Sequence, residues 1–149
     1  MKLVKEILYE KFSDESDPIK DMGIGMRHKI EEWIELDTEI KSHIHYYVIT
    51  GDGKINAKEV DISYTRLHLL PSYIRFGTIK NKFCCHFNNK KEIQQLPEYV
   101  GGYLKIFVLK KPNFTIKDII DICNVNPENI EIVLHDPIHH IYTTINLEK

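Results

Sequence analysis

The middle of the chain contains an imperfect repeat whose shared core is Leu-Pro-x-Tyr followed by Ile or Val. One copy covers positions 70–74 with Pro71, and the other covers 96–100 with Pro97. Short strands that recur every ~20–29 residues cannot bury their apolar face alone and must stack on one another. Such stacks build extended binding surfaces, so the repeat predicts a central sheet and an interaction role.

Length and charge fit one ordinary globular domain. A chain of 149 residues can bury a core of its own, so a single domain over 1–149 is expected. The formal net charge of −2 favours neither an anionic nor a cationic partner. Only Arg27, Arg66 and Arg75 are arginines. Because bidentate contacts to bases and phosphates use arginine, this composition disfavours nucleic-acid recognition.

Hydropathy and cysteine usage bear on the compartment. No apolar run approaches the ~18–20 residues of a membrane span, and the first residues lack the apolar core of a signal peptide. The cysteines are Cys84, Cys85 and Cys123, an odd number with an adjacent pair, which suits no disulfide framework. We therefore expect reduced, buried thiols in a cytoplasmic protein with no membrane partner.

Apolar spacing predicts helices before the repeat and a mixed segment after it. Helices are expected over 2–12 and 18–36, the second with Asp17 as N-cap and Pro18 in its first turn. Strands are expected over 46–49 and 103–109. Thr115-Ile-Lys-Asp resembles a capping box that opens another helix. A turn over 136–140 would join strands 130–134 and 141–147 as a hairpin.

The fold class that follows is α+β. N-terminal helices (1–40) would pack on a short repeat-derived β-sheet (44–112), with a C-terminal helix and hairpin (113–149) as the cap. About three repeats are normally needed for stability, and the chain has roughly two, so the flanking parts would supply much of the core. The stacked column is expected to contain Leu67, Leu70, Ile74, Phe83, Cys85, Ile93, Leu96 and Val100.

The segment 50–59 is similar to the second half of an EF-hand calcium loop. Gly53, Ile55 and Glu59 stand at matching offsets, but the first ligand position would be Val48. Calcium needs an oxygen ligand there, which valine does not have. We therefore expect a Gly-Asp-Gly turn between two strands.

Histidines and cysteines raise two further possibilities. Histidines near one another could hold a metal, and a thiol could act as a nucleophile with a histidine base. No zinc spacing, phosphate loop or hydrolase motif supports either possibility. We expect no cofactor, no metal and no enzymatic activity, with one of the two adjacent cysteines facing inward, Cys85. The residues concerned are His28, His43, His45, His86, His135, His139, His140, Cys84 and Cys85.

Tyrosines in the repeat give the candidate binding site. Tyrosine is enriched at protein interfaces, and Tyr73 and Tyr99 hold equivalent places in the two copies, so they should share a face. The candidate binding residues are Tyr73, Arg75, Phe76 and Tyr99. The lysines at 80, 82, 90 and 91 could instead contact phosphate, although a charge run is more often a solvated edge.

The repeat also resembles a known group of proteins. Residues 60–89, with Leu67-x-x-Leu70-Pro71 and Cys85-x-x-Asn88-Asn89, and the segment 96–102 are similar to short leucine-rich repeats of tailed-phage and prophage proteins. Segments 10–25 and 113–125 are also similar to those proteins, so the resemblance covers roughly 1–125. The chain departs from the pattern in having one such Cys-to-Asn turn and Ile93 where leucine is expected. These departures favour a compact α+β body over a long horseshoe.

The resemblance implies a phage or prophage origin, an interaction role and no catalytic residues. The leading hypothesis is a non-enzymatic module in the host cytoplasm that binds a host bacterial protein, such as a defence or regulatory enzyme, and inhibits it by steric occlusion. Alternatives are a nucleic-acid-binding accessory protein, a small enzyme or metal protein that uses the histidines, and a self-associating phage structural or assembly protein. The residues leave the partner and the oligomeric state open.

Overall fold

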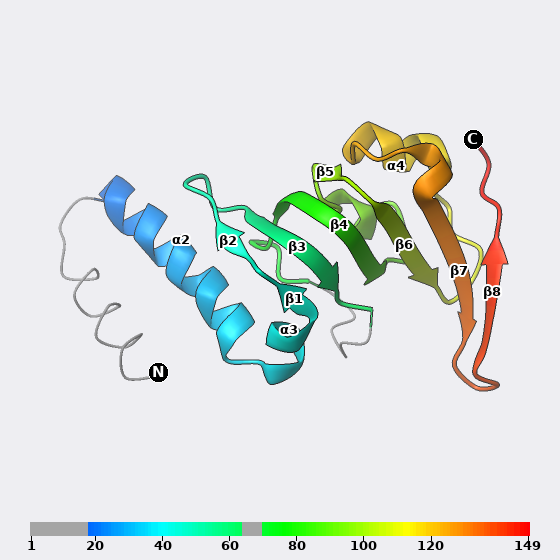
Figure 1. The fold of residues 1–149 in the computed structure, drawn as a ribbon, viewed down its shortest axis with the longest axis horizontal. Helices are drawn as coiled ribbons and strands as arrows, with labels where there is room; N and C mark the ends of the chain where they lie inside the picture. Colours follow the sequence, from blue (N-terminus) through cyan, green and yellow to red (C-terminus); the bar gives the residue numbers. More distant parts are fainter. Residues whose placement is uncertain (1–17, 64–69) are drawn as a thin grey trace.

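The computed structural model describes the backbone of residues 18–63 and 70–149, and the side chains from residue 25 onward within those ranges. The helix predicted over 2–12, the N-cap Asp17 and the column residue Leu67 lie outside the described residues. The described part is α+β, with one mixed sheet and a few helices (Figure 1). This agrees with the fold class that the sequence predicts.

Within the described residues, the sheet contains eight strands, and its order along the main path is β1-β3-β4-β6-β7-β8. The short strand β2 also pairs with β3, and β5 pairs with β4. The strands are β1 (Ile44–His45), β2 (Val48–Ile49), β3 (Ile55–Asp61), β4 (Phe76–His86), β5 (Tyr99–Val100), β6 (Tyr103–Val108), β7 (Ile130–Asp136) and β8 (Ile141–Ile145). The helical elements are α2 (Pro18–Glu35), α3 (Thr38–His43), α4 (Ile116–Ile122) and the 3-10 turns η1 (Glu92–Gln95) and η2 (Pro127–Asn129).

Four consecutive long strands, β3, β4, β6 and β7, run parallel to one another. Val60, Phe83, Leu104 and Ile130 stand opposite one another, one from each of these strands. Parallel neighbours need a crossover connection, and here η1 and α4 with η2 lie in the second and third crossovers. Strand β7 therefore continues the parallel ladder as well as forming the predicted hairpin with β8.

One face of this sheet forms the core. Phe83 and Cys85 of β4, Leu104 and Ile106 of β6 and Ile132 of β7 are buried together with Ile119 and Cys123 from α4 and its C-cap. Side chains alternate between the two faces of a strand, so the residues between these point to the opposite side. Of the predicted column, Leu70, Ile74, Phe83, Cys85, Ile93, Leu96 and Val100 are all buried in this core.

Helices lie at two places around the sheet, with α2 and α3 beside β1–β3 and α4 beside β6 and β7 (Figure 1). The range predicted for the second helix is confirmed, since α2 begins at Pro18 and ends at Glu35, next to Leu36. Ile30 and Ile34 of α2 join the core. The predicted capping box is also confirmed: the Thr115 hydroxyl accepts a bond from the Asp118 N–H, and the Asp118 carboxylate accepts one from the Thr115 N–H.

Local backbone geometry corrects one strand and confirms one turn. The strand predicted over 46–49 is shorter, because Tyr46 has a φ of 54° and turns the chain between β1 and β2. Residues 50–54 form the expected turn, with Gly53 at a φ of 79° in the region where glycine is favoured. The Thr50 N–H donates to the Lys54 carbonyl over 2.8 Å, which closes the turn.

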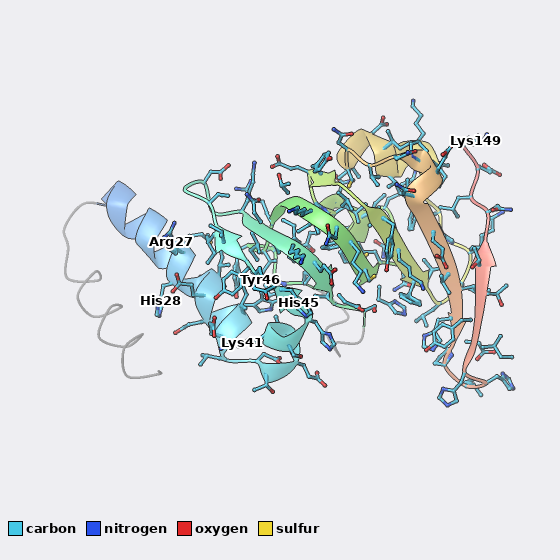
Figure 2. The ribbon with its side chains drawn as sticks, viewed as in Figure 1. Arg27, His28, Lys41, His45, Tyr46 and Lys149 are labelled. Atoms are coloured by element: carbon cyan, nitrogen blue, oxygen red, sulfur yellow. The ribbon has the colours of Figure 1, made fainter. Side chains whose placement is uncertain are left out.

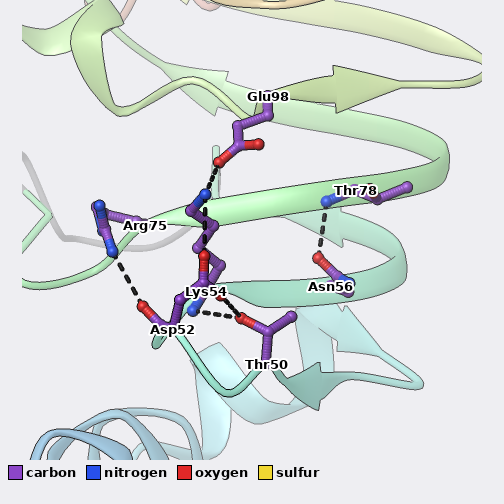
Figure 3. A network of polar contacts seen from close by, with 7 residues as sticks. All are labelled: Thr50, Asp52, Lys54, Asn56, Arg75, Thr78 and Glu98. Carbon is purple, nitrogen blue, oxygen red and sulfur yellow. Dashed lines mark hydrogen bonds and ion pairs between the residues drawn. The ribbon is translucent and has the colours of Figure 1, made fainter. Parts of the chain in front are cut away.

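Polar contacts attach this turn to the start of the parallel ladder (Figure 3). The Lys54 ammonium lies between the carboxylates of Asp52 and Glu98. The Arg75 guanidinium donates to the Asp52 carbonyl over 3.0 Å. These contacts connect the 50–54 turn, the segment before β4 and the segment before β5, so they fix the edge at which the strands begin.

Candidate binding face

The face of the sheet opposite the core is the candidate functional site. We call it the outer face and define it by the alternate residues of four strands. Its members are Lys82, Cys84 and His86 of β4, Tyr103, Lys105 and Phe107 of β6, Glu131, Val133 and His135 of β7, and Tyr142 and Thr144 of β8.

Apolar side chains form the floor of the outer face. Cys84 and Val133 are buried, yet neither belongs to the core cluster, because both point to the other side of the sheet. Cys84 lies opposite Asp61 and Lys105 in the ladder, and Val133 lies opposite Phe107 and Thr144. Their burial shows that the larger side chains around them close over the sheet. The outer face is therefore a packed surface and not a set of separate solvated side chains.

Four rings gather where β4, β6 and β7 end, and we call them the ring cluster: His86, Phe107, His135 and Tyr142. His135 and Tyr142 stack with centroids 4.6 Å apart. His86 lies 6.4 Å from Phe107 and 6.1 Å from His135, and Phe107 lies 5.9 Å from Tyr142 in an edge-to-face arrangement. Such pairs prefer stacked or T-shaped geometry at these separations. The cluster is thus an ordered aromatic surface, of which Tyr142 is 56% exposed.

Charges of alternating sign cross the strands next to the ring cluster. Asp61, Lys105 and Glu131 share one row with Cys84, and the Lys105 ammonium lies 3.9 Å from the Glu131 carboxylate. The same ammonium lies 5.3 Å from the Phe107 ring centroid. A mixed row of this kind gives no extended field of one sign. It therefore suits a protein partner better than a polyanion.

A second row of residues extends from the outer face across β3 to the β1 edge. The His45 imidazole lies 4.0 Å from the Glu59 carboxylate, and Glu59 stands opposite Lys82, which stands opposite Tyr103. Figure 2 places His45 at the opposite end of the sheet from Lys149. The surroundings of Lys82, above all Tyr103 and then Cys84 and Glu59, raise the pKa of its ammonium. The phosphate-binding role considered for the lysines would need them on one side, but Lys90 and Lys91 lie in the turn after β4.

The thiols are buried on both sides of β4. Burial raises the pKa of Cys84 to about 11 and that of Cys123 to about 12, and it raises the pKa of Cys85 well above its ordinary value. A thiolate is the reactive form of cysteine, so these environments suppress it near neutral pH. The prediction that Cys85 faces inward is confirmed, and Cys84 faces the outer side. Among the described residues, no group of three or more His, Cys, Asp or Glu side chains could hold a metal ion.

The structure separates the four binding residues that the sequence predicts. Phe76 is 2% exposed and lies edge to face with Phe83 in the core, so its side chain is not on the surface. Arg75 is bonded to the 50–54 turn. Tyr73 is half-buried against the core, and the Lys29 ammonium of α2 lies 4.7 Å from its ring centroid. Tyr99 alone is exposed on a strand, at 43%.

The predicted equivalence of Tyr73 and Tyr99 is wrong. Tyr99 pairs with Thr78, and Val100 pairs with Ile79, so the strand partner of Tyr99 lies beyond Tyr73 in the chain. Tyr73 itself precedes the first residue of β4. The sequence separation between the two Leu-Pro-x-Tyr motifs is therefore larger than the separation between residues that pair in β4 and β5. The tyrosine of the first copy falls in the turn that follows Pro71.

The ring cluster is not among the binding residues that the sequence predicts. The signal available was the alternation within strands, such as Tyr103, Lys105 and Phe107 between buried residues of β6. It could not show that Phe107, His86 and His135 lie side by side, because that depends on the register between strands.

The chain matches no protein-family model, and comparisons with curated proteins and with solved structures return no similar protein. None of the described helices is long and apolar enough to cross a membrane.

Proposed function

We propose that this chain is a non-enzymatic protein-interaction module that binds a protein partner through the outer face. The observation that carries the proposal is the ring cluster, an ordered patch of His86, Phe107, His135 and Tyr142 beside charges of both signs. Aromatic residues in packed surroundings dominate the energy of protein interfaces. A contact of about 800 Å² per partner is the usual size of a stable interface.

The parallel ladder supports a repeat origin for this face. Its paired residues Val60, Phe83, Leu104 and Ile130 recur at intervals within the ~20–29 residues of leucine-rich repeats. In such proteins, the strands present one continuous face to a partner. We therefore propose that the sheet is derived from repeats and that the N-terminal helices pack at its β1–β3 edge.

The class of partner follows from the resemblance of residues 1–125 to short repeats of tailed-phage and prophage proteins. We propose a phage or prophage origin, a place in the host cytoplasm and a host bacterial protein as the partner. Occlusion of a defence or regulatory enzyme by a preorganised surface is the proposed mechanism. Rigid rings lose little freedom on binding, which makes a preorganised face suited to an inhibitor.

Capture of partners by the tagged full chain from a bacterial lysate, at low and high salt, tests the proposal. The decisive comparison uses Tyr142→Ala in the ring cluster, Tyr99→Ala on β5 and Tyr46→Ala in the turn before β2. We expect one stoichiometric protein to survive high salt, to be lost with Tyr142→Ala and to be retained with Tyr46→Ala. Loss with Tyr99→Ala alone would move the site to the patch that the sequence predicts.

Other outcomes would overturn the proposal. Nucleic acid retained only at low salt would support the lysine-dependent alternative, because affinity for phosphate falls steeply with salt. A captured protein that binds all three variants equally would show that the outer face is not used. The tyrosine at 46 is a suitable control because its side chain is 84% exposed and lies outside the ring cluster.

A further inference from the structure

The sheet ends in an edge strand that carries no protection against pairing. Strand β8 is last in the strand order, and among the described strands it pairs only with β7. Figure 1 shows it at the far side of the sheet from α2. One row of its backbone N–H and C=O groups therefore faces away from every described strand. Proteins usually guard such an edge with lysine, proline, a bulge or a covering element, but β8 reads Ile-Tyr-Thr-Thr-Ile.

The two edges of the sheet differ in this respect. At the other edge, β1 and β2 are two residues long each and lie beside α2 and α3 (Figure 1). Strand β8 is five residues long and uncharged, and Ile141 and Tyr142 are 54% and 56% exposed. An exposed edge strand with no charged residue is the kind that pairs with another chain.

An apolar groove of about 690 Å³ opens at the same end of the molecule. Its aliphatic lining comes from α4, β7, β8 and the chain after β8: Ile116, Ile120, Ile130, Ile132, Ile145 and Leu147. The Ile116 N–H donates to the Glu148 carbonyl over 2.9 Å, so the C-terminal residues bound the groove on one side. Within the described part of the chain, the sheet thus ends at β8, and all of these side chains except the buried Ile132 are at least partly exposed.

The sequence of β8 is suited to pairing with itself. Ile141, Thr143 and Ile145 point to the core side, because they stand opposite Asp136, Leu134 and Ile132, and Ile132 is in the core. An antiparallel pairing centred on Thr143 would place Ile141 beside Ile145 of the second copy and would keep the whole strand paired. It would also keep apolar residues on the core side of both chains, since the two-fold axis would stand perpendicular to the sheet.

We infer that two copies of this chain form a dimer through antiparallel pairing of their β8 strands. The sheet would continue across the two-fold axis, and Ile141 of the second copy would extend the apolar surface at Ile145, which lines the groove. Backbone hydrogen bonds between the two β8 edges would supply affinity, and the isoleucines would supply buried area. The inference does not rest on the proposed function, because it uses the free backbone edge of β8 and the side chains of β8 that face the core, and not the ring cluster.

The test measures the mass of the full chain in solution over a wide concentration range, for the wild type and for two charge variants. The wild type is expected to dimerise. Thr143→Lys and Thr143→Glu are each expected to weaken the dimer by at least about tenfold, because like charges directly opposite destabilise a strand pair. An equal mixture of the two variants is expected to restore the dimer, since lysine would then face glutamate. A monomeric wild type, or a mixture that stays monomeric, would overturn the inference.

A crosslink provides a second readout that does not need the charge variants to fold. In Thr143→Cys, the new thiols would face each other across the axis, at the Cα separation of about 4.5–5.5 Å that a disulfide can bridge. The natural cysteines are buried and would not compete. Mild oxidation should crosslink this variant and leave Thr38→Cys, an exposed position on α3, uncrosslinked. Equal crosslinking of the two variants, or none, would overturn the inference.

Discussion

His135 and Tyr142 stand directly opposite each other in the β7–β8 ladder, and their rings stack with centroids 4.6 Å apart and planes inclined by 1°. Each ring also meets a third, since His135 contacts His86 and Tyr142 contacts Phe107. The four rings therefore hold one another in place on the solvent-exposed side of the sheet. An interface that begins from such a surface loses less side-chain entropy than one made from separate flexible residues.

The first prediction separates binding from stability at this surface. Tyr142→Ala should lower the free energy of unfolding by less than about 1 kcal/mol, which is the usual value of an exposed cross-strand pair. Phe83→Ala should lower it by about 3–5 kcal/mol, because that ring is buried in the core. Urea denaturation of the two variants measures both values. Equal losses would show that the ring cluster mainly holds the fold together.

A second prediction concerns the bend between β5 and β6. A Cβ atom at Gly102 would overlap the backbone carbonyl oxygen of Asn81 in β4. Because that neighbour is backbone, the strands would have to move apart, and Gly102→Ala should cost about 2–3 kcal/mol of stability. Gly25→Ala is the matched control, since a Cβ there meets nothing within 4 Å. In the interior of α2, it should instead stabilise the protein by about 0.5–1 kcal/mol.

Features encoded within a few residues of one another could be predicted from the sequence. The range of α2, the Thr115 capping box and the β7–β8 hairpin all follow from spacing, capping or turn residues close along the chain. The burial of the repeat's apolar residues could also be predicted, because leucines and isoleucines that recur on one face of a strand are stable only when that face is buried. These local signals were sufficient for the α+β class.

Features that depend on register between distant strands could not be predicted. The shared Leu-Pro-x-Tyr motif predicts that Tyr73 and Tyr99 are equivalent, whereas the strand partner of Tyr99 is Thr78. Phe76 is proposed from the sequence as a binding residue beside these tyrosines, but it begins β4 and packs on Phe83 in the core. The ring cluster could not be predicted for the same reason, because its members come from different strands whose connections differ in length. A sequence pattern indicates which residues of one strand share a face, but not which residues of the neighbouring strands lie beside them.

The third prediction concerns the thiols. Each unit of pKa changes the thiolate fraction tenfold, so a pKa of about 11 for Cys84 against its ordinary 9.0 makes its thiolate about a hundredfold scarcer near pH 8. All three cysteines should therefore react slowly with iodoacetamide in the native protein and rapidly in guanidinium. Cys84 should react first, because it is 5% exposed while Cys85 and Cys123 are fully buried. A Cys84→Ser variant should lose that first phase.

The same pKa values determine how stability depends on alkaline pH. A thiol whose pKa is higher in the folded state binds its proton more tightly there, so its contribution is complete below pH 9.0 and is lost as the pH rises toward about 11. The free energy of unfolding should thus fall over this range, and by less in Cys84→Ala than in the wild type. A native thiol that is alkylated as fast as in the unfolded chain would contradict the proposed burial.

The last prediction concerns the capping box of α4 in acid. Hydrogen bonds from the backbone and the side chain of Thr115 lower the pKa of the Asp118 carboxyl below its ordinary value of 3.8. A carboxyl whose pKa is lowered by folding adds stability above its unfolded pKa, and that stability is lost as the pH falls through the folded pKa. Asp118→Asn should therefore be less stable than the wild type at neutral pH, and the difference should shrink below about pH 3.8 as the wild-type carboxylate becomes protonated in the folded state.

Urea denaturation at neutral and acid pH measures this difference, with two reference variants. Thr115→Ala removes the N-cap hydroxyl and should cost about 1 kcal/mol at neutral pH. Asp121→Asn changes an exposed carboxylate further along α4, outside the capping box, and should show little of the pH-dependent difference. A wild-type advantage over Asp118→Asn that is the same at both pH values would mean that the carboxylate charge does not stabilise the start of α4. In that case the hydrogen bonds of the box would act through their geometry alone, because asparagine retains an acceptor for the Thr115 N–H.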